Sequence, residues 1–127
     1  MTVAILVILF AHFVGDFVVQ PDKVAQNKWH SNKALTIHVA LYTLMLFLFV
    51  WLFLIPTADF VTWHWYLYWA VLNGASHWVT DYVISKDRKT YWDEKDYRMY
   101  FIMVGFDQMA HYAVLAVSYS ILTNFII

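Results

Sequence analysis

Residues 72–86 read LNGASHWVTDYVISK, a mainly apolar stretch that carries His77 and Asp81 four residues apart. A spacing of four places both side chains on one face of an α-helix, about 6 Å apart along its axis. Ionisable side chains inside an apolar helix are costly, and by default they indicate a functional site. The stretch therefore predicts an apolar helix with one polar face.

The rest of the chain is similarly apolar. Of its 127 residues, 62% are hydrophobic and 13% are charged, which is far from the average of soluble domains. A helix that spans a membrane needs about 20 mainly apolar residues. The sequence thus predicts one all-α domain over residues 1–127, an integral membrane bundle of four transmembrane helices. Their expected ranges are 2–20, 34–55, 61–85 and 99–127.

The polar pair of the third predicted helix recurs in two others. His12 precedes Asp16 by four residues in the first helix, and Asp107 precedes His111 by four in the last. The reversed order fits a helix that runs in the opposite direction. Antiparallel packing then brings the aspartates to one level and the histidines to the next, and His38 of the second helix enters near the aspartate level.

The basic residues predict the orientation in the membrane. All eight Lys and Arg lie within residues 23–33 and 86–98, and none lies within 56–60. By the positive-inside rule both basic segments are cytoplasmic and both termini lie on the opposite side. Membrane lipid is the expected partner. A net charge of −1 argues against nucleic acid, and association with a second copy stays open.

The polar residues of the four helices predict a metal site. Cysteine is absent, so a bound metal would have imidazole, carboxylate and water as ligands. Zinc is the first choice, with manganese or iron as alternatives, and seven ligands are enough for two ions. The predicted ligands are His12, Asp16, His38, His77, Asp81, Asp107 and His111.

The leading functional hypothesis is a metal-dependent hydrolase that cleaves a phosphoester or related bond of a lipid headgroup or another amphipathic substrate at the cytoplasmic leaflet. Asp16, Asp81 and Asp107 are the candidate catalytic residues, one as a bridging ligand or general base. Lys28 and Lys86 are candidates for headgroup binding. The residues expected to orient the ligands are Gln20, Tyr42, Asn73 and Gln108.

Other interpretations of the same residues stay open. The histidines and aspartates could form a metal-free hydrogen-bonded network, or two histidines could hold a haem. The protein could also be a carrier of metal or protons, or a phage-type protein that binds a partner in the envelope. Transport would need a polar path to both faces, but residues 44–54 and 113–127 contain no acid, base or histidine.

Four segments resemble the family of small bacterial and phage membrane proteins known as domain of unknown function 3307. They are AHFVGDFVVQPDKVAQNK, HVALY, LNGASHWVTDYVISK and FDQMAHY. The resemblance covers nearly the whole chain and implies a bacterial inner membrane, or a host membrane for a phage-encoded protein. The spacing of the His/Asp pairs is also similar to that of membrane-bound metal-dependent hydrolases and of the helical zinc phospholipases and nucleases. The positions that match the domain of unknown function 3307 are His12, Gly15, Asp16, Gln20, Lys28, His38, Asn73, His77, Asp81, Lys86, Asp107, Gln108 and His111.

Overall fold

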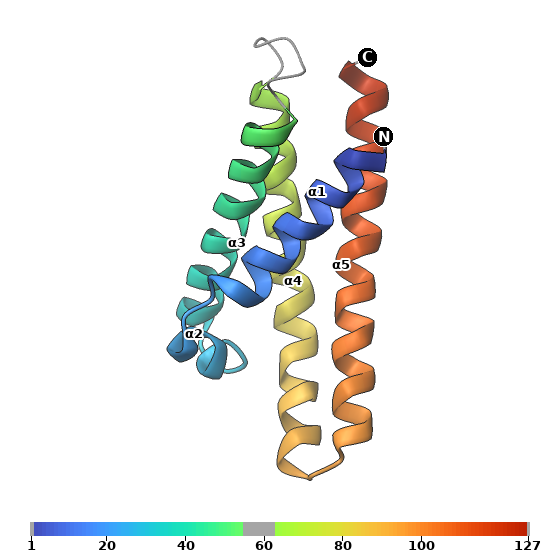
Figure 1. The fold of residues 1–127 in the computed structure, drawn as a ribbon. Helices are drawn as coiled ribbons and strands as arrows, with labels where there is room; N and C mark the ends of the chain where they lie inside the picture. Colours follow the sequence, from blue (N-terminus) through green and yellow to red (C-terminus); the bar gives the residue numbers. More distant parts are fainter. Residues whose placement is uncertain (1, 55–62, 127) are drawn as a thin grey trace.

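The computed structural model describes residues 2–54 and 63–126, and these residues are almost entirely helical (Figure 1). The described part contains no β-strand, so the all-α prediction is confirmed. The helices are α1 (Thr2–Phe13), the π-helix η1 (Val14–Val18), α2 (Asp22–Asn27), α3 (Asn32–Phe53), α4 (Trp63–Asp93) and α5 (Tyr97–Ile126).

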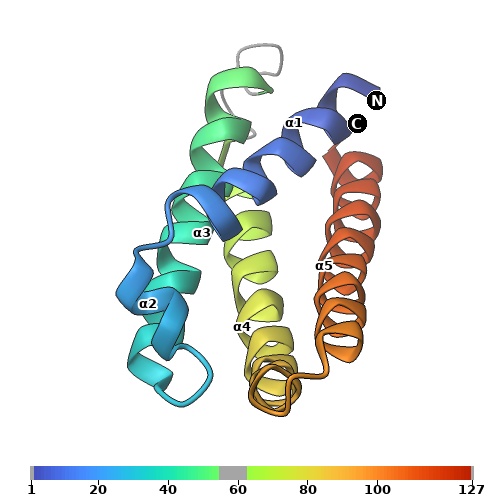
Figure 2. The same ribbon diagram turned by 60° about the horizontal axis from the view of Figure 1, so that its bottom comes forward.

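The three long helices form the body of the bundle. α3 packs against α4, and α4 packs against α5. α1 crosses the bundle obliquely from α5 to α3, and η1 and the short α2 follow it along α3 (Figures 1 and 2). The start of α1 and the end of α5 lie at one end, whereas the connection between α4 and α5 lies at the other.

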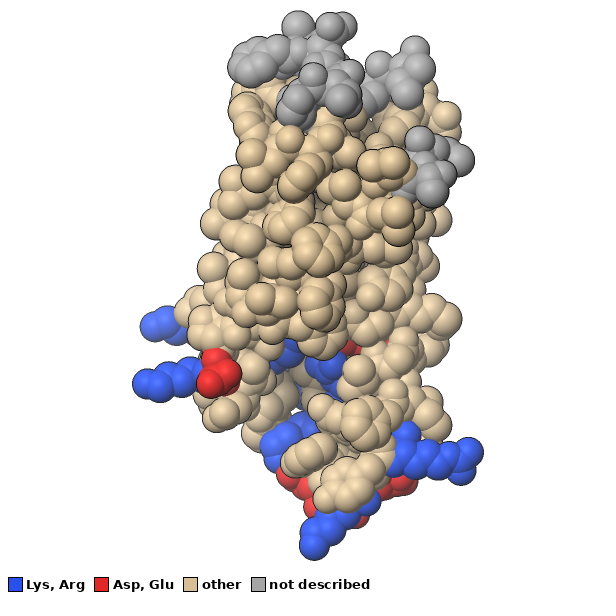
Figure 3. All heavy atoms as spheres, in the orientation of Figure 1, with Lys and Arg blue, Asp and Glu red and all other residues tan. Residues whose placement is uncertain are grey.

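Apolar and charged residues occupy different ends of this bundle. The apolar core lies in the half nearer the termini, where Leu46, Val50, Trp69, Leu115 and Leu122 are buried together. On the face shown in Figure 3, the visible Lys, Arg, Asp and Glu side chains lie at the opposite end. Both basic segments therefore lie at the same end of the bundle.

Several helix boundaries differ from the prediction. The first helix, expected over 2–20, is α-helical only to Phe13 and continues as the π-turn η1, in which Val19 N–H donates to the carbonyl of Val14. The third continues past Ser85 to Asp93, where Lys86, Arg88 and Lys89 are good helix formers. The fourth begins at Tyr97 rather than at residue 99.

Some predictions fall on residues that the structure does not describe. The predicted helix ends at 55, 61 and 127, and the connection over residues 56–60, lie outside the described residues.

Two glycines allow the helices to approach closely beside the polar residues. A Cβ on Gly15 would lie 3.0 Å from Cδ2 and 3.2 Å from Cα of Tyr42. A Cβ on Gly74 would lie 2.0 Å from Oγ1 of Thr43. α3 therefore contacts η1 and α4 at distances that a larger residue would prevent. Gly105 faces open space and has no such role.

Two of the described helices are long and apolar enough to cross a membrane. They are α3 and residues 97–125 of α5, with mean hydropathies of 2.1 and 1.3 in their most apolar windows. The apolar helix of residues 3–18 is shorter. α4 does not qualify, because its core carries Asn73, His77 and Asp81 as well as many Trp and Tyr residues. The fold is thus all-helical. Two of its helices have the length and hydropathy of a membrane span, whereas the sequence predicted four such helices.

Candidate metal centre

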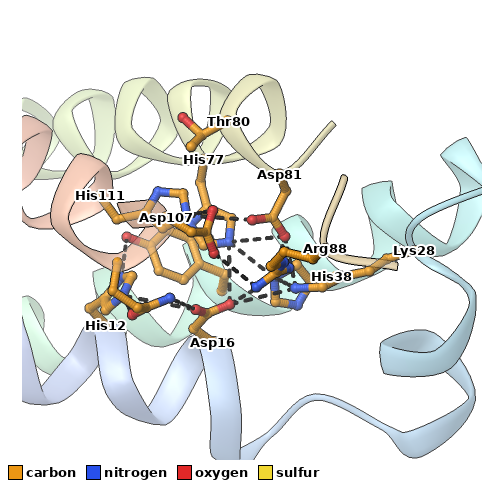
Figure 4. A network of polar contacts seen from close by, with 12 residues as sticks. His12, Asp16, Lys28, His38, His77, Thr80, Asp81, Arg88, Asp107 and His111 are labelled. Carbon is orange, nitrogen blue, oxygen red and sulfur yellow. Dashed lines mark hydrogen bonds and ion pairs between the residues drawn. The ribbon is translucent and has the colours of Figure 1, made fainter. Parts of the chain in front are cut away.

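The seven predicted ligands converge on one buried cluster (Figure 4). None is more than 4% exposed to solvent, although each carries polar or ionisable atoms. They come from all the long helices, so the cluster forms only when the whole bundle packs. His12 lies on α1, Asp16 on η1, His38 on α3, His77 and Asp81 on α4, and Asp107 and His111 on α5.

Four donor atoms form the first candidate binding position, which we call centre A: Oδ1 of Asp16, Nε2 of His38, Nε2 of His77 and Oδ2 of Asp81. Nε2 of His38 lies 3.1 Å from Asp16, 3.0 Å from His77 and 3.4 Å from Asp81. Nε2 of His77 lies 3.5 Å from Asp16 and 3.7 Å from Asp81. Ligands that share a tetrahedral zinc ion with bonds of about 2.0–2.2 Å lie about 3.3–3.6 Å apart. The distances in centre A spread from 3.0 to 3.7 Å around this range, so small shifts of the side chains would allow a tetrahedral ion.

Three donor atoms form a second position, centre B: Oδ1 of Asp81, Oδ1 of Asp107 and Nε2 of His111. The nitrogen lies 3.4 Å from each of the two oxygens. All three atoms are buried, and none has a hydrogen-bond partner. Buried polar atoms are nearly always satisfied, so three such atoms that face one another form a position that could hold a metal ion. A divalent cation would satisfy all three.

Asp81 belongs to both centres. Its Oδ2 contributes to centre A and its Oδ1 to centre B. A carboxylate with one oxygen directed to each position is the usual arrangement of a bridging ligand in a two-metal site. The remaining buried side-chain atoms without a hydrogen-bond partner in the described residues also belong to this region: Asp16 Oδ1, Gln20 Oε1, His38 Nδ1, His77 Nδ1 and Ser85 Oγ.

Two basic side chains reach into the cluster from the charged end of the bundle. Nζ of Lys28 lies 2.8 Å from Oδ2 of Asp81 and 3.9 Å from Oδ1 of Asp16. Nη1 of Arg88 donates a hydrogen bond of 3.1 Å to Oδ2 of Asp107. The sequence indicated Lys28 as a headgroup-binding residue, and it predicted no contact of Arg88 with the buried aspartates. The sequence could have indicated this contact, because Arg88 follows Asp81 by two helical turns and lies on the same face of the helix once α4 is extended.

His12 lies beside the two centres but contributes no donor atom to either of them. Its Nε2 donates to Oε1 of Gln108 at 2.9 Å, and the Tyr42 hydroxyl, 3.2 Å from Nδ1, completes the ring's hydrogen bonds. Nε2 of Gln108 in turn donates to Oδ2 of Asp16 at 2.8 Å. The three residues therefore orient the carboxylate of Asp16. The ligand role predicted for His12 has no support in these distances and stays a prediction.

The predicted layer of histidines is present. The ring centroids of His77 and His111 lie 4.0 Å apart and stack, and His12 lies 5.5 Å from His111. Stacked rings leave no room for a macrocycle between them, which argues against the haem interpretation. His38 lies at the aspartate level, as its distances to Asp16 and Asp81 show.

The other predicted residues lie farther from the donor atoms. Asn73 donates to the carbonyl of Trp69 and to the hydroxyl of Ser118, rather than to a histidine. Lys86 lies over the ring of Tyr82, with Nζ 4.3 Å from its centroid. Neither contact orients a ligand of centre A or B, so both predicted roles stay predictions.

A pocket of about 480 Å³ opens beside the cluster, between η1, α2 and the charged ends of α4 and α5. Figure 3 shows basic and acidic atoms within this hollow. Gln20, the remaining predicted orienting residue, lies in its wall. The lining residues are Asp16, Phe17, Gln20, Ala25, Gln26, Lys28, Trp29, Ser85, Arg88, Lys89, Trp92 and Tyr100.

Together these features define an all-helical protein with a buried His/Asp cluster that could bind metal. The chain belongs to the family described as Protein of unknown function (DUF3307), whose model matches residues 4–126. No curated protein and no solved structure matches the chain.

Proposed function

We propose that this protein is a membrane-embedded, metal-dependent hydrolase that cleaves a phosphoester or related bond of a headgroup at the cytoplasmic leaflet. The observation that carries the proposal is the pair of facing donor groups that share Asp81.

The exposed apolar surface of the bundle supports a location in the membrane. Only 33% of the most apolar window of α3 and 17% of that of α5 is buried within the chain. The core helix of a soluble protein would be mostly buried, whereas these helices expose Leu52, Phe53, Phe101, Ile121 and Phe125. Lipid is the environment that covers so much apolar surface at low cost. With the basic end in the cytoplasm, all four long segments would cross the bilayer.

The ligand types support zinc, with manganese or iron as alternatives. Imidazole nitrogen and carboxylate oxygen are ligands that all three metals accept. Centre A offers four protein ligands, which is typical of a closed zinc site. Centre B offers three, which is typical of catalytic zinc because the fourth position is free for water. We therefore propose two ions of unequal role, with Asp81 between them.

The pocket supports a hydrolytic reaction at the cluster, because Asp16 of centre A and Arg88, the partner of Asp107 in centre B, both line it. If zinc bound at centre B, it would lower the pKa of water and supply a nucleophile near neutral pH. In the proposed reaction water would attack phosphorus, the ester P–O bond would break, and the leaving alcohol would take up the proton that the water gives up. Asp81 and Asp107 would hold the reacting position, and Arg88, which donates to Asp107, connects it to the pocket. The products are a phosphate and an alcohol.

A second candidate is a metal-free ion network. It is favoured by the contacts of Lys28 with Asp81 and of Arg88 with Asp107, since two basic groups already neutralise two of the three carboxylates. A carrier of metal or protons is less well supported, because the half of the bundle beyond the cluster is packed with apolar side chains. A cavity that opens at the charged end suits an enzyme better.

Metal content is the test of the proposal. We expect about two zinc ions per chain in detergent-purified protein by mass spectrometry, and loss of metal in the double variant His77→Ala with Asp81→Ala. His64→Ala, which changes the same residue type on α4 outside the cluster, should retain both ions. A metal-loaded protein that releases no phosphate from a panel of phosphoesters in nanodiscs would leave the metal site in place but reject the hydrolase. A metal-free parent would favour the ion network.

A further inference from the structure

Lys28 and Arg88 each lie between the buried carboxylates of the cluster and the pocket. Each contacts a buried carboxylate of the cluster, Lys28 at 2.8 Å from Asp81 and Arg88 at 3.1 Å from Asp107. Each also lines the pocket. They are partly buried, with 11% and 15% of their side chains exposed. Their charged groups therefore lie at the boundary between the donor atoms and the pocket.

The charges of the cluster do not allow these contacts and two metal ions at the same time. Three carboxylates face two basic side chains, so the described arrangement is already nearly neutral. Two divalent cations would add four positive charges to this space. A protonated Lys28 would then lie beside a cation that shares its partner Asp81, and Arg88 would share Asp107 in the same way. Like charges at such separations in a buried site repel strongly.

The pocket is the nearest space into which both groups can turn. It already contains Lys89, which pairs with Asp93 and lies 5.3 Å from the ring of Trp29. Asp16 is the one acidic residue among the lining residues of this pocket. Three basic side chains directed into such a space would form a site for an anion. The guanidinium of Arg88 matches the oxygens of a phosphate group through paired hydrogen bonds.

The walls of the pocket suit a headgroup rather than a bare ion. Phe17, Trp29, Trp92 and Tyr100 line it together with the basic residues. A volume of about 480 Å³ lies within the range of pockets that enclose a small ligand. Three basic groups favour a phosphate monoester, which carries nearly two negative charges, over a zwitterionic headgroup.

We propose that metal binding releases Lys28 and Arg88 from their carboxylates into the pocket, where they bind the phosphate group of an anionic headgroup. Metal and phosphate therefore bind cooperatively, and each raises the affinity of the protein for the other. The inference rests on the proposed metal-dependent function and adds to it the substrate class, a phosphate monoester, and the residues that position it. Lys28 also competes with the metal for Asp81.

Calorimetry on the full chain in nanodiscs of zwitterionic lipid tests this coupling. Glycerol phosphate is titrated into the metal-free protein and into protein loaded with zinc and freed of excess metal. We expect at least about a fivefold gain in phosphate affinity on zinc loading, the lower end of the usual range of coupling. In a second arm, phosphatidic acid in the nanodisc replaces glycerol phosphate and should raise zinc affinity similarly. Coupling to glycerol phosphate alone would support the anion site and assign it to a soluble phosphate.

Variants separate positioning from folding. Arg88→Gln should retain zinc but lose the gain in phosphate affinity, whereas Arg98→Gln, at an exposed position of α5, should behave as the parent. Lys28→Met should bind zinc more tightly, because the competing ammonium is removed, and bind phosphate more weakly. A residue that only maintains the fold would not change these two affinities in opposite directions.

The results distinguish this inference from the proposed function. Zinc that binds normally, with equal phosphate affinity in the loaded and metal-free protein, would overturn the coupling and leave the metal site intact. Coupled binding without any phosphate release would support the inference and reject hydrolysis. Failure to bind zinc would overturn both.

Discussion

Two polar clusters lie one helical turn apart in this bundle, and they differ in how their atoms are satisfied. In the first, Asn73 bonds to Trp69 and Ser118, and the indole of Trp69 donates to the same hydroxyl at 2.8 Å. In the second, the three donor atoms of centre B have no hydrogen-bond partner. The first cluster is a complete structural network. The second could hold a metal ion. Burial alone therefore does not distinguish the two clusters, whereas donor atoms without hydrogen bonds do.

The largest expected effect comes from Asp81→Asn. This change removes the one carboxylate that both centres share, and an amide is a poor bridging ligand. It also leaves Lys28 without its buried partner, a situation that typically destabilises a protein by about 3–5 kcal/mol. We expect loss of both ions by mass spectrometry and a lower free energy of unfolding. Asp87→Asn, an exposed acid on the same helix, is the control, and equal metal content in the two variants would contradict the bridge.

Gln108→Ala should have an intermediate effect. Gln108 links His12 to Asp16, and it orients a ligand without contributing a donor atom to either centre. Loss of such an outer contact usually lowers metal affinity about 10–100-fold. Competition with a chromogenic chelator would measure the change. Asn124→Ala, at an exposed amide of the same helix, should leave the metal affinity unaltered. An unaltered affinity in Gln108→Ala as well would show that the contacts of Gln108 do not support metal binding.

The smallest effect on the site is expected for Asn73→Ala. This change disrupts the hydrogen-bonded cluster of Asn73, Trp69 and Ser118 and leaves the donor atoms of the metal centre in place. The change leaves the hydroxyl of Ser118 with fewer partners, which should lower the free energy of unfolding by about 1–3 kcal/mol. Metal content and metal affinity should stay at the parent level. Chemical denaturation measures the first quantity and the chelator assay the second. Loss of metal without loss of stability would show that Asn73 orients a ligand of the site, the role that the sequence predicted for it.

Much of the site could be predicted from the sequence, because helical periodicity is local. The spacing of four in His77 and Asp81 fixes a shared face whatever the fold, and the reversed order in Asp107 and His111 fixes an antiparallel neighbour. Six of the seven predicted ligands contribute donor atoms to centre A or B. The exception is His12, whose alternative partners Gln108 and Tyr42 lie on other helices and depend on how these cross.

The remaining features depend on tertiary structure. Arg88 reaches Asp107 only because α4 continues to Asp93, and the charged composition of that segment favoured a loop. Lys28 reaches Asp81 because α2 folds back along α3, which no local pattern specifies. The π-turn that carries Asp16 is likewise a result of packing against α3. π-turns occur often at functional sites, but they have no clear sequence signal.

Anomalous diffraction at the zinc absorption edge, from crystals of the zinc-loaded protein in lipid, tests the central claim most directly. The account predicts two anomalous peaks on opposite sides of the Asp81 carboxylate, one among Asp16, His38 and His77 and the other beside Asp107 and His111. Lys28 and Arg88 should then have left their carboxylates and turned into the pocket. A structure without zinc peaks, in which Lys28 still contacts Asp81 and Arg88 still contacts Asp107, would contradict the metal centre and establish a permanent ion network in its place.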